Sequence, residues 1–260
     1  MRNRVTIAVK DGVADVRLSR GDKLNAIDRA MFDALAEAIQ MLATRVDVRA
    51  VVLSGEGEGF CSGLDMAAMA GGELAGLDLS ARTHGPANGV QQVAWGWRTL
   101  SVPVIAAVHG VAFGGGTQIM AGADIRLAHP ATRFAIREVH WGIVPDMGGF
   151  ALWRGMREDV LREWVYTARE FDAAEALAAG FVTRLVEDPR GEALALARRI
   201  AERSPDAVRS AKRLFGAMGR APEDMLAMES AEQVALMRGA NFREAVRANM
   251  ERRRADFRDG

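Results

Sequence analysis

Three consecutive glycines and two acidic residues are the features of this sequence with the clearest chemical meaning. Gly114 to Gly116 lie within the segment Ala107 to Gln118, directly after an apolar, β-rich run. Glycines let a backbone approach a ligand without obstruction by a Cβ atom, and the helical pattern that follows would aim free N–H groups at that ligand. Glu138 and Asp146 follow in the chain and could move protons. The pattern predicts a site that stabilises a negatively charged oxygen while acids transfer protons.

Patterns on both sides of the glycines predict an α/β core. Val5 to Val9 and Val13 to Leu18 alternate apolar with polar residues across Lys10-Asp-Gly12, which predicts a hairpin. Asp28 is placed to cap a helix, and Ala50 to Leu53 after that helix are typical of a buried strand. Further along, we expect a buried strand at Val102 to Val108, a short helix at Gln118 to Ala121 and a strand at Asp124 to Leu127.

Beyond Phe171 the pattern becomes mainly helical. The expected helices cover residues 172–179, 192–203, 205–218, 223–237 and 242–257. Gly71 to Gly89 is rich in small residues and weakly patterned, so we expect a surface loop there.

Composition favours a globular protein that acts on small molecules. The chain has 260 residues, 49% of them hydrophobic, and its 34 basic residues match its 34 acidic residues, so no bulk charge favours nucleic acid or a membrane surface. The single cysteine excludes an internal disulfide, and no Cys/His spacing predicts a metal site. The first residues lead into a strand-like alternation, and no apolar run approaches the roughly 20 residues of a membrane span. We expect a cytoplasmic protein without nucleic-acid or membrane partners.

Two other classes of protein, nucleotide-binding proteins and serine hydrolases, have weaker support in the sequence. Neither Gly55-Glu-Gly57-Glu-Gly59 nor the glycine triplet has the spacing of a dinucleotide-binding loop or a phosphate loop with its lysine. Ser62 lacks the G-x-S-x-G elbow of many serine hydrolases, and no histidine is obviously placed as its base.

Several motifs, in the right order and spread over nearly the whole chain, resemble those of the crotonase superfamily, also called the enoyl-CoA hydratase/isomerase family. They are Lys23-Leu-Asn-Ala26, Phe60-Cys-Ser-Gly-Leu-Asp65, Ala107 to Gln118, Asp124-Ile125 and Glu138 to Gly149. The resemblance implies an α/β fold, with a spiral core of β-β-α units in residues 1–195 and a helical C-terminal trimerisation region in 196–260. It also implies an acyl-CoA thioester substrate, no cofactor beyond the coenzyme A of that substrate, and a homotrimer or a dimer of trimers.

The resemblance assigns roles to individual residues. Backbone N–H groups of Ser62 and Gly115 would hold the enolate oxygen that forms when a thioester loses an adjacent proton. Family hydratases place two glutamates around one water, and here the two positions hold Gln118 and Glu138. A glutamine can orient water but cannot exchange a proton. Asp146 matches a position at which dienoyl-CoA isomerases carry a catalytic aspartate, although it could instead cap a following helix.

The resemblance also places coenzyme A and the acyl chain. Lys23 is the candidate for a phosphate contact, and backbone near the glycine triplet and in the turn after Ser62 would meet the rest of the substrate. The assigned residues are Gly63, Leu64, Asp65, Met66 and Gly114. Met66, Met69, Trp95 and Trp97 are either lining of the acyl tunnel or plain core.

Three functions remain open at this point. Double-bond isomerisation of an unsaturated acyl-CoA is favoured, with Glu138 and Asp146 moving protons. The alternatives are a hydratase in which Gln118 suffices, and a catalytically weak acyl-CoA-binding protein.

Overall fold

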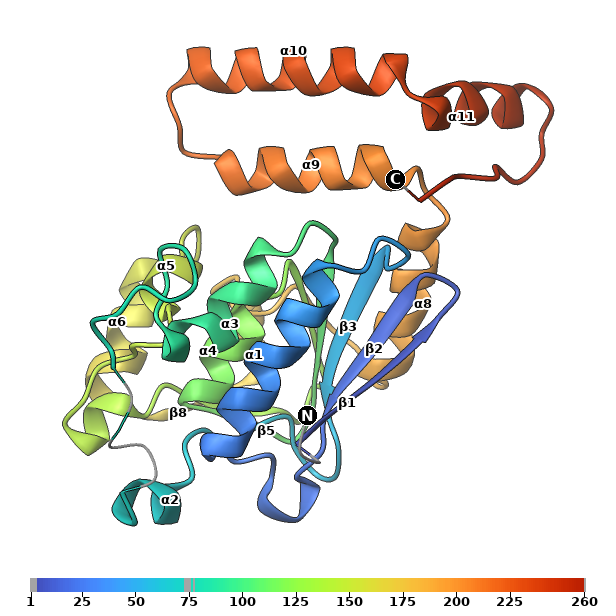
Figure 1. Ribbon diagram of the computed structural model, residues 1–260. Helices are drawn as coiled ribbons and strands as arrows, with labels where there is room; N and C mark the ends of the chain where they lie inside the picture. Colours follow the sequence, from blue (N-terminus) through green and yellow to red (C-terminus); the bar gives the residue numbers. More distant parts are fainter. Residues whose placement is uncertain (1–3, 73–75, 77, 260) are drawn as a thin grey trace.

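The computed structural model describes residues 4–72, 76 and 78–259. These residues form two sheets, one of six strands and one of three. The larger sheet has the order β1-β2-β3-β4-β6-β9, with β1 and β2 antiparallel and the remaining neighbours parallel (Figure 1). Its strands are β1 (Val5–Lys10), β2 (Val13–Leu18), β3 (Ala50–Gly55), β4 (Val104–Val108), β6 (Ile125–Ala128) and β9 (Arg184–Leu185). The smaller sheet contains β5 (Val111–Phe113), β7 (Arg133–Ala135) and β8 (Glu170–Asp172), in that order.

Helices cover both faces of the large sheet. The first part of the chain contributes η1 (Gly21–Lys23), α1 (Arg29–Ala43), α2 (Met66–Ala70), α3 (Gly89–Thr99), α4 (Gly115–Ala121), η2 (Glu138–Trp141) and α5 (Gly149–Leu152). The second part contributes α6 (Glu158–Thr167), α7 (Ala173–Ala178), α8 (Pro189–Ala201), α9 (Pro205–Ala217), α10 (Pro222–Arg238) and α11 (Ala240–Met250). No helix among the described residues is both long enough and apolar enough to cross a bilayer.

The pleat of β3 divides the core into two layers. All six residues of this strand are buried, as expected for a parallel strand covered on both faces. Val51 and Leu53 belong to the larger apolar cluster with α1 and α3, whereas Ala50 and Val52 belong to a second cluster with the alanines of α8. Alternate side chains of β3 thus point to opposite faces of the sheet, and each set packs into one of the two clusters.

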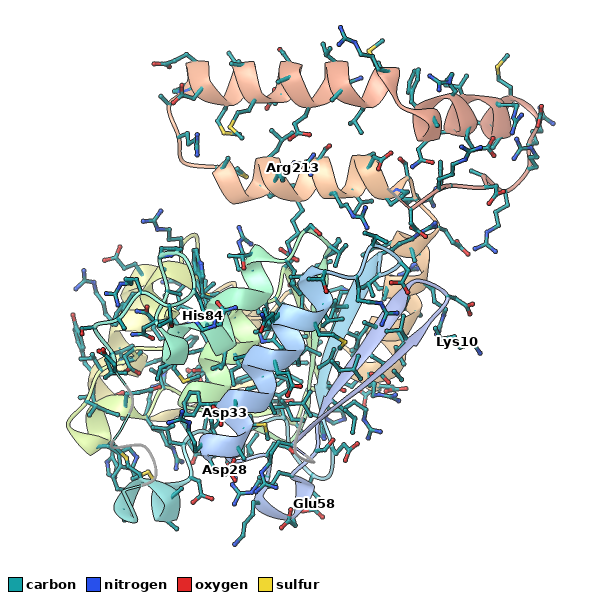
Figure 2. The ribbon with its side chains drawn as sticks, viewed as in Figure 1. Lys10, Asp28, Asp33, Glu58, His84 and Arg213 are labelled. Carbon is teal, nitrogen blue, oxygen red and sulfur yellow. The ribbon has the colours of Figure 1, made fainter. Side chains whose placement is uncertain are left out.

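The N-terminal predictions are confirmed. β1 and β2 pair in register across a two-residue turn in which Asp11 and Gly12 both have positive φ, which matches the twist of a hairpin. Asp28 begins α1 by accepting a hydrogen bond from the Met31 N–H at 2.8 Å, and lies at the start of that helix in Figure 2. The short helix after the glycines starts at Gly115, three residues earlier than predicted.

The expected loop from Gly71 to Gly89 includes residues 73–75 and 77, which lie outside the described residues. Its described part before α3 contains no helix, and His84 and Ala87 form an isolated bridge. The segment ends where Asn88 caps α3 with a reciprocal capping box to Gln91.

The C-terminal helices α9, α10 and α11 stand beside the core, with α10 stacked on α9 (Figure 1). Arg213 of α9 pairs with Glu232 of α10 at 2.6 Å (Figure 2). The last helix is shorter than predicted, because Arg252 takes a positive φ and the chain then turns back. Asn241 holds the returning segment through two hydrogen bonds to the backbone of Arg258.

The division expected at residue 195 falls inside α8. Ala193, Ala197 and Ala201 of this helix are buried against the sheet. We therefore propose that the change from core to C-terminal region lies between α8 and α9, at residues 202–204.

Candidate active site

The loop that contains Ser62 lies against the segment that enters the glycine triplet. The Phe113 N–H donates to the Cys61 carbonyl at 2.9 Å. A Cβ atom on Gly63 would lie only 2.8 Å from the Phe113 carbonyl oxygen, and Gly63 has a φ of +88°. Both observations require glycine at position 63. The fold thus brings together the two segments that the sequence analysis placed around a thioester oxygen.

The amide of Ser62 is not available to a ligand, contrary to our expectation. Its N–H donates to the Leu24 carbonyl at 2.9 Å. Two residues later, the Leu64 N–H has no hydrogen-bond partner among the described residues. No sequence signal marks this difference, because it depends on which way each peptide unit faces.

Leu64 is held on both sides by the segment that precedes α1. The Ile27 N–H donates to the Gly63 carbonyl at 2.8 Å, and the Asp65 N–H donates to the Ile27 carbonyl at 2.9 Å. Arg20 reinforces this pairing, because its guanidinium donates to the Ala26 carbonyl at 3.0 Å and pairs with Asp65 at 2.8 Å. The loop is therefore fixed from outside the site.

The Lys23-Leu-Asn-Ala26 motif has a structural purpose in this arrangement. Leu24 and Asn25 both have positive φ, which is uncommon for residues other than glycine. The buried Asn25 side chain donates to the Glu56 and Gly59 carbonyls and accepts from the Arg20 N–H, all within 2.9 Å. These bonds hold the unusual backbone that aims the Leu24 carbonyl at Ser62.

Gly115 supplies a second free N–H at the first position of α4. Helix starts leave their first N–H groups without partners, and the Gly115 N–H has none among the described residues. A Cβ at Gly115 would lie 2.8 Å from the Met147 sulfur and 2.9 Å from Ile27 Cδ1, so this amide sits between apolar side chains. An oxygen bound here would be partly shielded from water.

Gln118 is buried one helical turn beyond Gly115, and its orientation is fixed. Its Oε1 accepts from the N–H groups of Met147 at 2.9 Å and Gly149 at 3.0 Å. Its Nε2 must therefore face the other way, where it donates to Glu138 Oε1 at 2.7 Å. The amide acts here as a fixed donor to a carboxylate.

Glu138 is the buried carboxyl group of the site, only 6% exposed. Desolvation raises its pKa above the ordinary value, the charge of Asp146 adds to the rise, and the Gln118 hydrogen bond opposes it. Its Oε2 has no partner among the described residues. A Cβ at Gly114 would lie 3.6 Å from Glu138 Oε1, so the carboxyl group adjoins the start of the glycine triplet.

Asp146 is solvent-exposed, yet the protein around it desolvates it enough to raise its pKa. It does not cap the following helix. α5 begins at Gly149, and the residue at its N-cap is Gly148, without a side-chain hydrogen bond. The alternative interpretation of Asp146 as a cap is therefore wrong.

The residues assigned to coenzyme A lie around the same loop. Lys23 is exposed, and its carbonyl lies 3.4 Å from the Ser62 hydroxyl. Asp65 caps α2 by accepting from the Ala67 and Ala68 N–H groups, so its carboxylate is committed to the fold. Met66 begins α2 and is half-buried.

The two tryptophans differ in their surroundings. Trp97 is fully buried in the core, with its Nε1 donating to the Val93 carbonyl at 2.9 Å. Trp95 instead lines a cavity of about 1080 Å³ that contains none of the residues assigned to catalysis.

Known proteins resemble this chain over nearly its full length. A family model described as enoyl-CoA hydratase/isomerase matches residues 8–260. The mitochondrial Delta(3,5)-Delta(2,4)-dienoyl-CoA isomerase of Rattus norvegicus is 31% identical over 270 residues, which cover 96% of this chain and 80% of the relative. Enoyl-CoA hydratase EchA19 of Mycobacterium tuberculosis is 30% identical over 249 residues, with coverage of 94% and 92%.

A solved structure has the same fold. The crystal structure of a putative enoyl-CoA hydratase from Streptomyces coelicolor A3(2) superposes with a TM-score of 0.88 at 33% identity, covering 99% of this chain and 94% of that one. The expected α/β crotonase fold is confirmed. The chain belongs to the enoyl-CoA hydratase/isomerase family.

Proposed function

We propose that this protein isomerises a double bond in an unsaturated acyl-CoA thioester. The observation that carries the proposal is the fixed amide of Gln118, which leaves Glu138 and Asp146 as the two acids available for proton transfer. A relative that matches 96% of the chain is a dienoyl-CoA isomerase. Gln118 cannot serve as a second acid beside Glu138.

The enolate would be stabilised by two backbone donors. In the bound complex the thioester oxygen would lie between the N–H groups of Leu64 and Gly115, which have no partner among the described residues. Loss of one such donor typically costs about 3 kcal/mol of transition-state stabilisation. Leu64 replaces Ser62 as the donor, because the Ser62 N–H is bonded to the Leu24 carbonyl.

Proton movement then connects two carbons of the acyl chain. Glu138 in its carboxylate form takes a proton from the carbon that becomes part of the enolate. The electron pair moves into the conjugated system, and a proton is returned at a more distant carbon by Asp146 in its acid form. Raised pKa values bring both carboxyl groups nearer to neutrality, where a group can both take and give a proton.

Hydration is the second candidate, and one observation favours it. Glu138 Oε2 is buried without a partner among the described residues, and a water bound there could also be oriented by Gln118. Hydratases also occur among the relatives at similar identity. A catalytically weak acyl-CoA-binding protein is the remaining possibility, in which the site would hold a thioester without turning it over.

Product mass in deuterated water tests the proposal. Purified protein is given 2-enoyl-, 3-enoyl- and 3,5-dienoyl-CoA thioesters. A product with an unchanged skeleton and incorporated deuterium supports isomerisation, whereas addition of a whole water supports the hydratase. Binding without any change in mass would overturn both.

We also propose a trimer or dimer of trimers. No residue of α10 is buried, and this helix exposes Leu226, Val234 and Met237. An apolar surface of this kind favours association with further copies. The mass in solution, measured by light scattering, would distinguish a trimer from a dimer of trimers, and a monomer mass would contradict the proposal.

A further inference from the structure

A cavity of about 1080 Å³ lies between α9 and the adjoining ends of α3, α4 and α5. Its wall is unbalanced in charge. It holds five cationic side chains and one carboxylate, namely Arg98, Arg126, Arg154, Arg203 and Lys212 against Asp124. Apolar residues, among them Ile125, Leu152 and Phe215, form much of the remaining wall.

The single carboxylate is already neutralised. Lys212 Nζ lies 2.8 Å from Asp124 Oδ2, and Arg98 lies 3.6 Å from the other oxygen. Desolvation lowers the pKa of Arg126 and of Lys212, and the charge of Arg98 lowers both further. Arg98 therefore repels both Arg126 and Lys212.

Several guanidinium groups retain donors for a ligand. Arg154 and Arg203 have no ion pair or side-chain hydrogen bond with any residue that the structure describes. Arg126 uses Nε and Nη1 for the Phe181 and Ala123 carbonyls, which leaves Nη2. A guanidinium binds a carboxylate through parallel N–H groups.

The cavity shares a wall with the catalytic centre. Trp95 and Leu152 line it, and both lie within 3.9 Å of the position of a Cβ on Gly148. The next residue, Gly149, donates to Gln118. α4 also connects the two places, since it begins at Gly115 and ends at Ala121 in the cavity wall, a helix of seven residues that spans about 10 Å at ~1.5 Å per residue.

We infer that this cavity receives the far end of the acyl chain and selects acyl groups that end in a carboxylate. The inference rests on the proposed function, because it extends the same substrate beyond the reacting carbons. Apolar wall would contact the methylene groups, and the arginines would pair with the terminal anion. Neutral acyl chains would leave the cationic cluster uncompensated.

Two matched thioesters test this inference. They have equal chain length and equal unsaturation, and one ends in a methyl group while the other ends in a carboxylate. Dissociation constants and kcat/KM are measured for the wild type, for Arg154→Gln with Arg203→Gln, and for Arg199→Gln. Arg199 is the control, because it is exposed on α8 and does not line the cavity.

The wild type should bind the carboxylate-ended thioester at least tenfold more tightly. The double variant should lose about tenfold for that thioester alone, the size of a lost charge-assisted contact. Arg199→Gln should leave the dissociation constants of both thioesters unchanged. Equal binding of the two thioesters by the wild type, or a preference that survives in the double variant, would overturn the inference.

Turnover and binding of the two thioesters distinguish failure of the inference from failure of the proposed function. If neither thioester is turned over, the proposed function fails, whereas the two dissociation constants still decide the inference. A free dicarboxylate is also added together with the neutral thioester. If the dicarboxylate tightens binding of the neutral thioester to the level of the carboxylate-ended one, the cavity serves a separate anion and the inference about the acyl chain is wrong.

Discussion

Gln118 Nε2 donates to Glu138 Oε1 at 2.7 Å, while Gln118 Oε1 accepts from two backbone N–H groups. The two bonds to Oε1 decide which end of the amide faces the carboxylate. The neutral donor lets Glu138 ionise in a buried position without a second charge beside it on α4.

Replacement of Glu138 by Gln should reduce turnover by about 10² to 10⁴, because the group that accepts the substrate proton is lost. The same variant should be more stable than the wild type at neutral pH, by an amount of the order of 1 kcal/mol. Burial raises the pKa of Glu138, so the folded protein holds this proton more tightly than the unfolded chain does. At low pH, protonated Glu138 makes its full contribution to the free energy of unfolding. This contribution declines as the pH rises from the ordinary pKa of a glutamate through the raised pKa of Glu138 in the folded protein.

Urea unfolding of both proteins between pH 3 and pH 8 checks this effect. The stability difference should vanish near the acidic end. A variant that is less stable than the wild type at neutral pH would show that the ionised carboxylate stabilises the fold.

Replacement of Gln118 by Glu should introduce hydration, with a gain of about 10² over the wild type for a 2-enoyl-CoA. The new carboxylate could keep both backbone hydrogen bonds but would face Glu138, so the pair would share one proton near neutrality. Steady-state rates across pH measure the change. No gain in water addition would mean that the missing acid is not what limits hydration.

Replacement of Asp146 by Asn should lower isomerisation by about 10² and leave the melting temperature nearly unchanged. The carboxylate makes no cap bond to α5, so the fold does not depend on it. Because a raised pKa lets Asp146 act as an acid, wild-type activity should fall as pH rises through that pKa. The remaining activity of the variant should not show this fall. A large fall in melting temperature would instead indicate a structural role.

Arg20 should act as a positioning residue, since it links Asp65, beside the Leu64 donor, to Asp28 and the Ala26 carbonyl. Arg20→Gln should lower kcat about tenfold with little change in KM, because the displaced Leu64 N–H matters most when the oxygen carries charge. Arg20→Lys should restore part of the stability but not the rate, since an ammonium cannot reproduce the guanidinium geometry. A rise in KM as large as the fall in kcat would contradict this role.

Gly116→Ala should destabilise the protein by about 2 kcal/mol or more, because the added Cβ would lie 2.4 Å from the Cys61 carbonyl oxygen. Gly89→Ala is the matched control. It also lies in the first turn of a helix, and an added Cβ would meet nothing within 4 Å. We expect this control to be neutral or stabilising by up to about 1 kcal/mol. Thermal unfolding of both variants gives the comparison.

The sequence by itself determined the elements with strong local signals. The alternation of β1 and β2, the Asp28 cap and the apolar run of β3 are short-range patterns, so their positions were predictable. The short strands β5, β7 and β8 have only three residues each and were not predicted, because such lengths carry too little periodicity. The early end of α11 was also missed, since the returning chain that Asn241 holds is a tertiary contact.

The tertiary structure decided the roles within the site. Residue types drew attention to the glycine triplet and to Glu138, because glycine freedom and acid chemistry belong to the residues themselves, and the family resemblance assigned Gly115 and Gln118 to the site. The choice between the amides of Ser62 and Leu64 depends on which peptide N–H is already bonded. Here the Ser62 N–H donates to the Leu24 carbonyl, which leaves the Leu64 N–H. The orientation of the Gln118 amide likewise depends on backbone groups about 30 residues away. Hydrogen bonds between distant segments fix both, and no local pattern records them.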